Sequence, residues 1–103
     1  MKEIEILNHV KAALRVRSDD PGIISEILGL IERAKFDLKA SGIKISTTNE
    51  LGEEVYDETI VSAISLYCKS QFGFDNPEAD RLYEAYRMFE KQLALSKEYK
   101  DEV

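Results

Sequence analysis

Four segments of the chain repeat apolar residues at the spacing of an α-helix, and no other feature of the sequence constrains the fold as strongly. The first helix is predicted over about residues 3–15, where the apolar side chains fall within about a third of the helix circumference. A second helix is predicted over about residues 21–41. Asp20 followed by Pro21 is typical of a helix N-terminus, and Gly42 is typical of a left-handed C-terminal position.

The third and fourth helices are predicted over about residues 57–72 and 77–96. The third is apolar nearly all the way round, so we expect it to be the central, buried helix. The fourth begins at Asn76 and Pro77 and gathers its apolar residues within an arc of about 120°. A chain of 103 residues is long enough for one domain. The expected fold is therefore all-α, a single four-helix bundle-like domain, with a charged tail over residues 97–103 that frays.

Residues 43–56 lose the helical period, and we expect them to form one long loop between helices 2 and 3. Long loops inside small domains are often functional, so this segment is the best candidate for reaching a partner. The candidate partner residues are Ile45, Asn49, Leu51, Glu53, Glu54 and Tyr56. The alternative is a tolerated insertion without a function.

The composition excludes several kinds of chemistry. One cysteine and one histidine cannot supply a structural zinc site or a disulfide within the chain, and no base is placed to activate a nucleophile. We therefore expect no enzyme activity, no cofactor and no metal. The acidic run that includes Glu53 and Glu54 could hold a hard cation, but solvated side chains near a helix N-terminus explain it better.

Charge and hydropathy limit the possible partners. The longest stretch without a charge has ten residues, too short for a membrane helix, and the N-terminus lacks a signal-peptide pattern, so the cytosol is the expected compartment. The net charge of −6 resides entirely in residues 51–103. A chain of pI near 4.8 without a basic cluster should not bind DNA tightly, which favours protein partners.

Some apolar residues lie outside the predicted core faces. On the second helix, Phe36 points to the same side as Ser25 and Gly29, away from the isoleucines. On the fourth helix, the spacing of Met88, Leu95 and Tyr99 predicts a second apolar face. Surplus apolar faces favour self-association through these residues. The alternative is that other parts of the same chain cover them.

A segment near the third helix carries a family resemblance. Residues 63–82 contain Lys69, Phe72 and Gly73 at the end of an apolar helix, followed by an Asn-x-x-Ala-Asp-Arg helix start; in this start the family positions are Asn76, Ala79 and Arg81. This pattern resembles the small helical head–tail connector proteins of long-tailed bacteriophages and prophages, often labelled DNA-packaging or head-completion proteins. The resemblance covers about residues 5–99.

The resemblance implies a structural role. Subunits of such proteins form a homo-oligomeric ring beneath the portal protein, extend the DNA channel after genome packaging and join head to tail. The implied partners are sister copies, the portal protein and a tail or stopper completion protein, while DNA passes through without tight binding. Assembly would occur in the bacterial host cytoplasm, and the final location would be the virion head–tail junction. The alternative function is a non-enzymatic helical adaptor or regulatory protein that binds a single protein partner.

Overall fold

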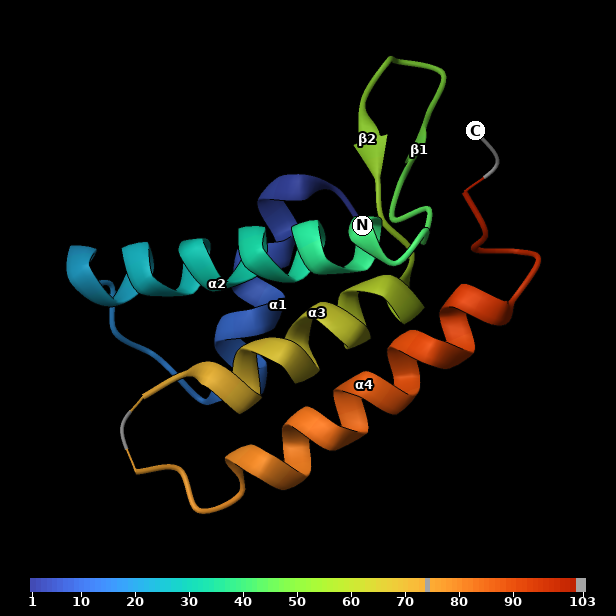
Figure 1. Ribbon diagram of the computed structural model, residues 1–103. Coiled ribbons are helices and arrows are strands. Elements are labelled where there is room, and N and C mark those ends of the chain that lie inside the picture. The colour runs from blue at the N-terminus through green and yellow to red at the C-terminus, as the bar shows by residue number, and fades with distance from the viewer. Residues whose placement is uncertain (74, 102–103) are drawn as a thin grey trace.

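A computed structural model describes residues 1–73 and 75–101 (Figure 1). Four helices and one two-stranded antiparallel sheet make up the described chain. Their bounds are α1 Glu3–Leu14, α2 Pro21–Ala40, β1 Thr47–Thr48, β2 Glu54–Val55, α3 Glu58–Gln71 and α4 Ala79–Leu95. The prediction of a mainly helical chain with four helices is confirmed.

Local capping explains where α2 and α3 begin. The carboxylate of Asp20 accepts hydrogen bonds from the backbone N–H groups of Gly22 and Ile23 at 3.1 and 3.2 Å, and Pro21 occupies the first turn. Asp57 accepts from the backbone N–H of Ile60 at 2.9 Å. The predicted cap Asp20 is confirmed, and Asp57 acts in the same way, since each satisfies N–H groups that the helix leaves free.

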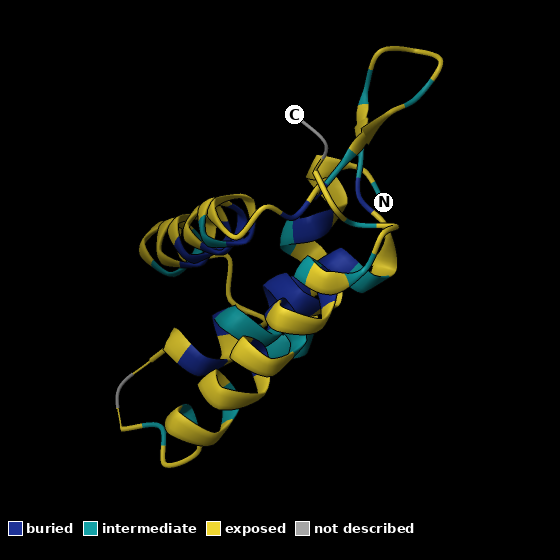
Figure 2. Ribbon diagram, turned by 45° about the vertical axis from the view of Figure 1, so that its right-hand side comes forward, coloured by how far each residue is buried: buried dark blue, intermediate teal, exposed yellow. Residues whose placement is uncertain are grey.

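α3 is the central helix, as its composition predicts. It packs against α1, α2 and α4, and most of its apolar residues are buried, while Leu66 and Tyr67 are half-buried (Figure 2). The side chain of Ile64 is completely buried, with a relative exposure of 0%. The core around α3 is formed by Ile6, Val10, Ile27, Leu30, Ile31, Ala34, Leu38, Ile43, Ile45, Tyr56, Ile60, Val61, Ala63, Ile64, Cys68, Tyr86 and Leu93.

The helices do not form a closed bundle. α4 packs chiefly against α3, and the domain is flat, with extents of 38 × 32 × 18 Å. Leu28 of α2 and Tyr83 of α4, which lie at the edges of the apolar faces of their helices, are 45% and 39% exposed. An apolar face predicted from periodicity is wider than the strip that one neighbouring helix can cover, so the edges of the face stay in contact with water.

Residues 43–56 are not the plain loop that we expected. β1 and β2 pair antiparallel, with Thr47 opposite Val55, and form a hairpin that projects from one end of the domain (Figure 1). At its base, Ile45 and Tyr56 are buried in the core at 4% and 2% exposure. These two predicted partner residues therefore anchor the hairpin to the domain instead of facing a partner.

The C-terminal segment, which we expected to fray over residues 97–103, forms hydrogen bonds with the rest of the domain; residues 102–103 lie outside the described part. The backbone N–H of Lys44 donates to the carbonyl of Tyr99 at 2.7 Å, and that of Asp101 donates to Gly42 at 2.9 Å. These bonds fix the end of the chain along the segment that leads into the hairpin.

The N-terminus joins the same end of the molecule. The backbone N–H of Tyr56 donates to the carbonyl of Met1 at 2.8 Å, and Lys2 forms an isolated antiparallel bridge with Val55. The start of the chain, the hairpin and the C-terminal segment therefore meet beside the N-terminus of α3 (Figure 1).

A buried polar group ties α1 and α2 to the hairpin. The ammonium of Lys35 pairs with Glu3 and lies 4.9 Å from the centre of the Tyr56 ring. The Tyr56 hydroxyl donates to Glu3 and Glu54 at 2.7 and 2.9 Å. Burial opposes ionisation of Glu3, but hydrogen bonds from Lys35 and Tyr56 hold the pKa of Glu3 below its ordinary value.

Candidate interaction surfaces

The first candidate surface is the exposed face of α2. Phe36 is 76% exposed, and Ser25 and Gly29 are exposed on the same side of the helix. A pocket of about 400 Å³ beside Phe36 is also lined by Tyr67 of α3 and by charged residues of α2. Leu28 adds to the apolar area of this helix.

Among the described residues, the space above Gly29 is open. A Cβ atom built there would have no atom of the described chain within 4 Å, apart from its two chain neighbours and the backbone of its own helix. Glycine inside a helix costs about 1 kcal/mol relative to alanine. Within the described part of one chain, close packing at Gly29 does not offset this cost.

Gly29→Ala should therefore raise the free energy of unfolding of the single domain by about 1 kcal/mol, measured by urea denaturation. Gly52→Ala serves as the control. Gly52 has a φ of +79° in the hairpin turn, so alanine there should destabilise the domain. A destabilised Gly29→Ala variant would show that the α2 notch is filled within one chain.

The second candidate surface is the outer face of α4. Met88 is 64% exposed and Leu95 is 85% exposed, two helical turns apart. Tyr99 does not share this face, because α4 ends at Leu95 and the following segment turns back toward the hairpin. The Tyr99 hydroxyl instead donates to Asp57 at 2.7 Å, at the N-terminus of α3.

The third candidate surface is the hairpin tip, which we define as residues 49–52. The side-chain oxygen of Asn49 accepts from the backbone N–H groups of Leu51 and Glu53 at 2.9 and 3.0 Å. This turn presents Leu51 at 81% exposure. Glu53 pairs with Lys2 at 3.3 Å, and Glu54 is held by the Tyr56 hydroxyl. Of the predicted partner loop, Leu51 and Glu54 are thus exposed, and Asn49 and Glu53 are half-buried.

Ile4 is an exposed apolar residue that the sequence analysis missed. It lies near the start of α1 and is 79% exposed. Ile4 lies beside the acidic base of the hairpin, because the hairpin contacts the N-terminal segment of the chain.

The residues of the family resemblance build the connection from α3 to α4. The Asn76 side chain donates to the carbonyl of Lys69 at 3.0 Å and accepts from the backbone N–H of Glu78. Gly73 adopts a φ of +82°, and Arg81 pairs with Glu78 at 2.8 Å. The side chains of Phe72 and Ala79 are half-buried. The structure corrects one detail, because Asn76 caps a turn and α4 begins only at Ala79.

This turn is part of a match that covers most of the chain. The family model described as phage connector protein matches residues 6–100. The chain belongs to the phage connector protein family. No curated protein and no solved structure gave a significant match. Connector proteins of phages are structural components, so the family supports a structural role for this connector and its interaction with other head or tail proteins.

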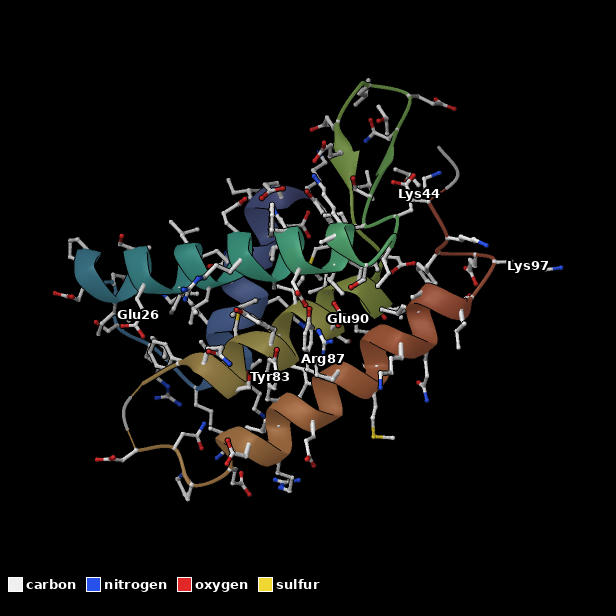
Figure 3. The ribbon with its side chains drawn as sticks, in the orientation of Figure 1. Glu26, Lys44, Tyr83, Arg87, Glu90 and Lys97 are labelled. Carbon is white, nitrogen blue, oxygen red and sulfur yellow. The ribbon has the colours of Figure 1, made fainter. Side chains whose placement is uncertain are left out.

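A carboxyl pair joins α2 and α4 beside the pocket of Phe36. Ser41 donates to Glu90 at 2.9 Å, and the Tyr86 hydroxyl donates to Asp37 at 2.6 Å. Arg87 contacts Glu90 at 2.7 Å (Figure 3). The Glu90 side chain is almost fully buried. This set is the main polar connection between the two helices of the connector that carry the exposed faces.

The two carboxyl groups have opposite pKa shifts. Burial raises the pKa of Glu90, and the hydrogen bond with Asp37 raises it further. Burial alone would also raise the pKa of Asp37. The hydrogen bonds from Glu90 and Tyr86 and the charge of Arg87 outweigh this effect and hold the pKa of Asp37 below its ordinary value. As pH rises, Asp37 therefore loses its proton before Glu90 does.

Glu90→Gln should change how the stability of the connector depends on pH. A raised pKa in the folded state contributes stability that is complete below the ordinary pKa of glutamate and is lost as pH rises through the raised value. Glutamine stays neutral and does not lose this contribution. The unfolding free energy of the variant, relative to that of the wild type, should therefore increase as pH rises from 4 to 7. Asp37 has a lowered pKa, so its own contribution should be lost from both proteins as pH falls.

Urea unfolding across this pH range measures the difference, and Glu84→Gln, an exposed site on the same helix, is the control. An equal pH slope for wild type and Glu90→Gln would contradict the assigned shift.

The remaining reactive groups do not form a catalytic site among the described residues. Burial raises the pKa of the Cys68 thiol to about 12, so the thiolate that a nucleophile requires is not populated at neutral pH. His9 is exposed on α1. In the described part of the chain, no group of three or more acidic, histidine or cysteine side chains could hold a metal ion. Over the same residues, no helix has the length and hydropathy to cross a bilayer.

Proposed function

We propose that this connector is a subunit of a homo-oligomeric ring beneath the portal, which extends the DNA channel and joins head to tail after genome packaging. The observation that carries the proposal is the presence of two different exposed apolar faces on one chain. Phe36 lies on α2, and Met88 and Leu95 lie on α4. In a monomer, both faces leave apolar surface in contact with water, which is unfavourable; a contact between subunits would bury this surface.

Two different faces suit a ring better than a symmetric dimer. In a dimer with two-fold symmetry the same patch of both subunits meets itself, whereas a ring joins one patch of each subunit to another patch of the next. The faces on α2 and α4 are proposed as the two halves of this contact. The pocket beside Phe36 offers a recess for an apolar side chain of the neighbour.

The charge of the chain is compatible with a DNA channel. A net charge of −6 at pH 7 gives no net electrostatic attraction to the DNA phosphates, so DNA can pass without tight binding. The neighbours along the channel are proposed to be the portal protein on one side and a tail or stopper completion protein on the other. The subunits would assemble in the host cytoplasm and remain at the head–tail junction of the virion.

The decisive experiment measures mass. Light scattering and native mass spectrometry over a series of protein concentrations should reveal ring-sized oligomers, or growth from monomer toward them, and portal rings should retain the connector in a pull-down. A chain that stays monomeric and does not bind portal rings would overturn the proposal. A stable one-to-one complex with a different single protein would instead support the adaptor alternative.

A further inference from the structure

The hairpin tip carries an apolar side chain without a partner in its own chain. Leu51 is 81% exposed, although four hydrogen bonds of Asn49, two to its side chain and two of its backbone, fix the turn that presents it. A fixed turn loses little conformational entropy on binding, so an apolar residue on it suits insertion into a pocket. Exposed Glu50 precedes Leu51 in the chain, and Glu53, two residues beyond Leu51, is paired with Lys2, so the hairpin around the tip is acidic.

A pocket with the complementary character lies at the other end of α3. Its volume is about 420 Å³, and we call it the distal pocket. Apolar side chains of Leu14, Phe72 and Leu82 line it, and Arg15 and Lys69 add positive charge. Pockets of roughly 300–1,000 Å³ hold small ligands, so one leucine side chain fits. The acid on its rim, Glu78, is already paired with Arg81.

The hairpin cannot reach this pocket within one chain. It leads directly into the N-terminus of α3 (Figure 1). The lining of the pocket instead includes Lys69 and Phe72, at the C-terminus of α3. α3 has 14 residues, and a rise of about 1.5 Å per residue separates its ends by about 21 Å. Any contact between tip and pocket therefore joins two molecules.

We propose that the hairpin tip of one copy of this chain inserts Leu51 into the distal pocket of a second copy. The acidic hairpin then faces Arg15 and Lys69, and the two surfaces differ, as a head-to-tail contact requires. This inference deepens the proposed function, on which it rests, because it names a contact through which sister copies join. It also gives Lys69 and Phe72, residues of the family pattern, a role beyond the turn.

Two variants that each lose one side of the contact provide the test. Leu51→Asp removes the apolar tip, and the double variant Arg15→Glu with Lys69→Glu reverses the charge of the pocket. All three positions are exposed, so the fold should persist, as circular dichroism can check. Leu51→Met and Lys91→Glu are the matched controls, since the first keeps an apolar tip and the second reverses an exposed charge outside the pocket.

Each variant alone should associate at least about 30-fold more weakly than the wild type, the effect of losing one hot-spot side chain. An equimolar mixture of the two should recover one tip–pocket contact per pair, seen as a dimer of twice the 11.7 kDa chain mass that neither variant forms through this contact alone. The dimer is expected because the Leu51→Asp copy still has a pocket and the pocket variant still has a tip. Sedimentation velocity measures both results.

Unchanged assembly of Leu51→Asp, or a mixture that stays monomeric, would overturn the inference, while rings formed through the α2 and α4 faces would leave the proposed function standing. For a wild type that is monomeric in solution, a second measurement decides. Leu51→Cys mixed with Ala13→Cys at high concentration should give a disulfide-linked heterodimer, because Cys68 is buried and does not compete. Absence of that cross-link would overturn the contact.

Discussion

Ile64→Asp should abolish the native fold of this connector. Ile64 is completely buried near the middle of α3, the helix against which the other three pack. An aspartate there would carry an unpaired charge in the core, at a cost above about 4 kcal/mol. Domains of this size have only about 5–15 kcal/mol of stability, so most molecules should lose cooperative unfolding and much of their helical signal.

Circular dichroism and a thermal melt measure this loss. Ser62→Asp is the control, because Ser62 lies on the same helix but is exposed. The control should melt as the wild type does. A folded Ile64→Asp domain with a normal melting curve would mean that α3 is not the centre of the core.

Phe36→Asp and Leu95→Asp should each leave the monomer folded and weaken assembly. The two side chains are 76% and 85% exposed, so a charge there meets water in the isolated chain. In a ring contact the same charge would be buried without a partner. We expect the dissociation constant between subunits to rise by at least about 30-fold, as for loss of a central interface residue.

Sedimentation velocity provides the measurement, and retained helical circular dichroism confirms folding. Ile4→Asp is the matched control, since Ile4 is equally exposed but lies on neither face. Unaltered assembly of Phe36→Asp would remove the α2 face from the ring contact, and unaltered assembly of Leu95→Asp would do the same for α4.

The sequence was sufficient where local chemistry decides the structure. Asp20 with Pro21 and Asp57 mark the starts of α2 and α3 because capping depends on residues close in the chain. The apolar residues of 60–68, which lie nearly all the way round the helix, identified α3 as the buried helix. Helix α4 was expected two residues too early, because Asn76 caps a turn that precedes the helix.

The end of the molecule beside the hairpin could not be predicted in the same way. Strands of two residues carry no periodic signal, and their stability depends on partners far away in the sequence, such as Met1 with Tyr56 and Lys44 with Tyr99. The pairing of Lys35 at the base of the hairpin could not be predicted for the same reason, since its partners Glu3 and Tyr56 come from separate segments of the chain.

The candidate surfaces could also be predicted from the sequence only in part. Helical periodicity placed Phe36, Met88 and Leu95 outside the core faces, and all three are exposed. It failed for Tyr99, because that reasoning assumed that the helix continues beyond Leu95. Ile45 and Tyr56 were assigned to a partner loop because a loop predicted from sequence gives no indication of which of its side chains turn inward.

The one-sided packing of α4 has a consequence for motion. From Ala79 to Ala85 the helix has no fully buried side chain, and the first one is Tyr86. Backbone amides in its opening turns should therefore exchange with deuterium sooner than those of α3, through local opening that leaves the rest of the domain intact. A neighbour that slows this exchange would reveal, without any crystal, which part of α4 it covers.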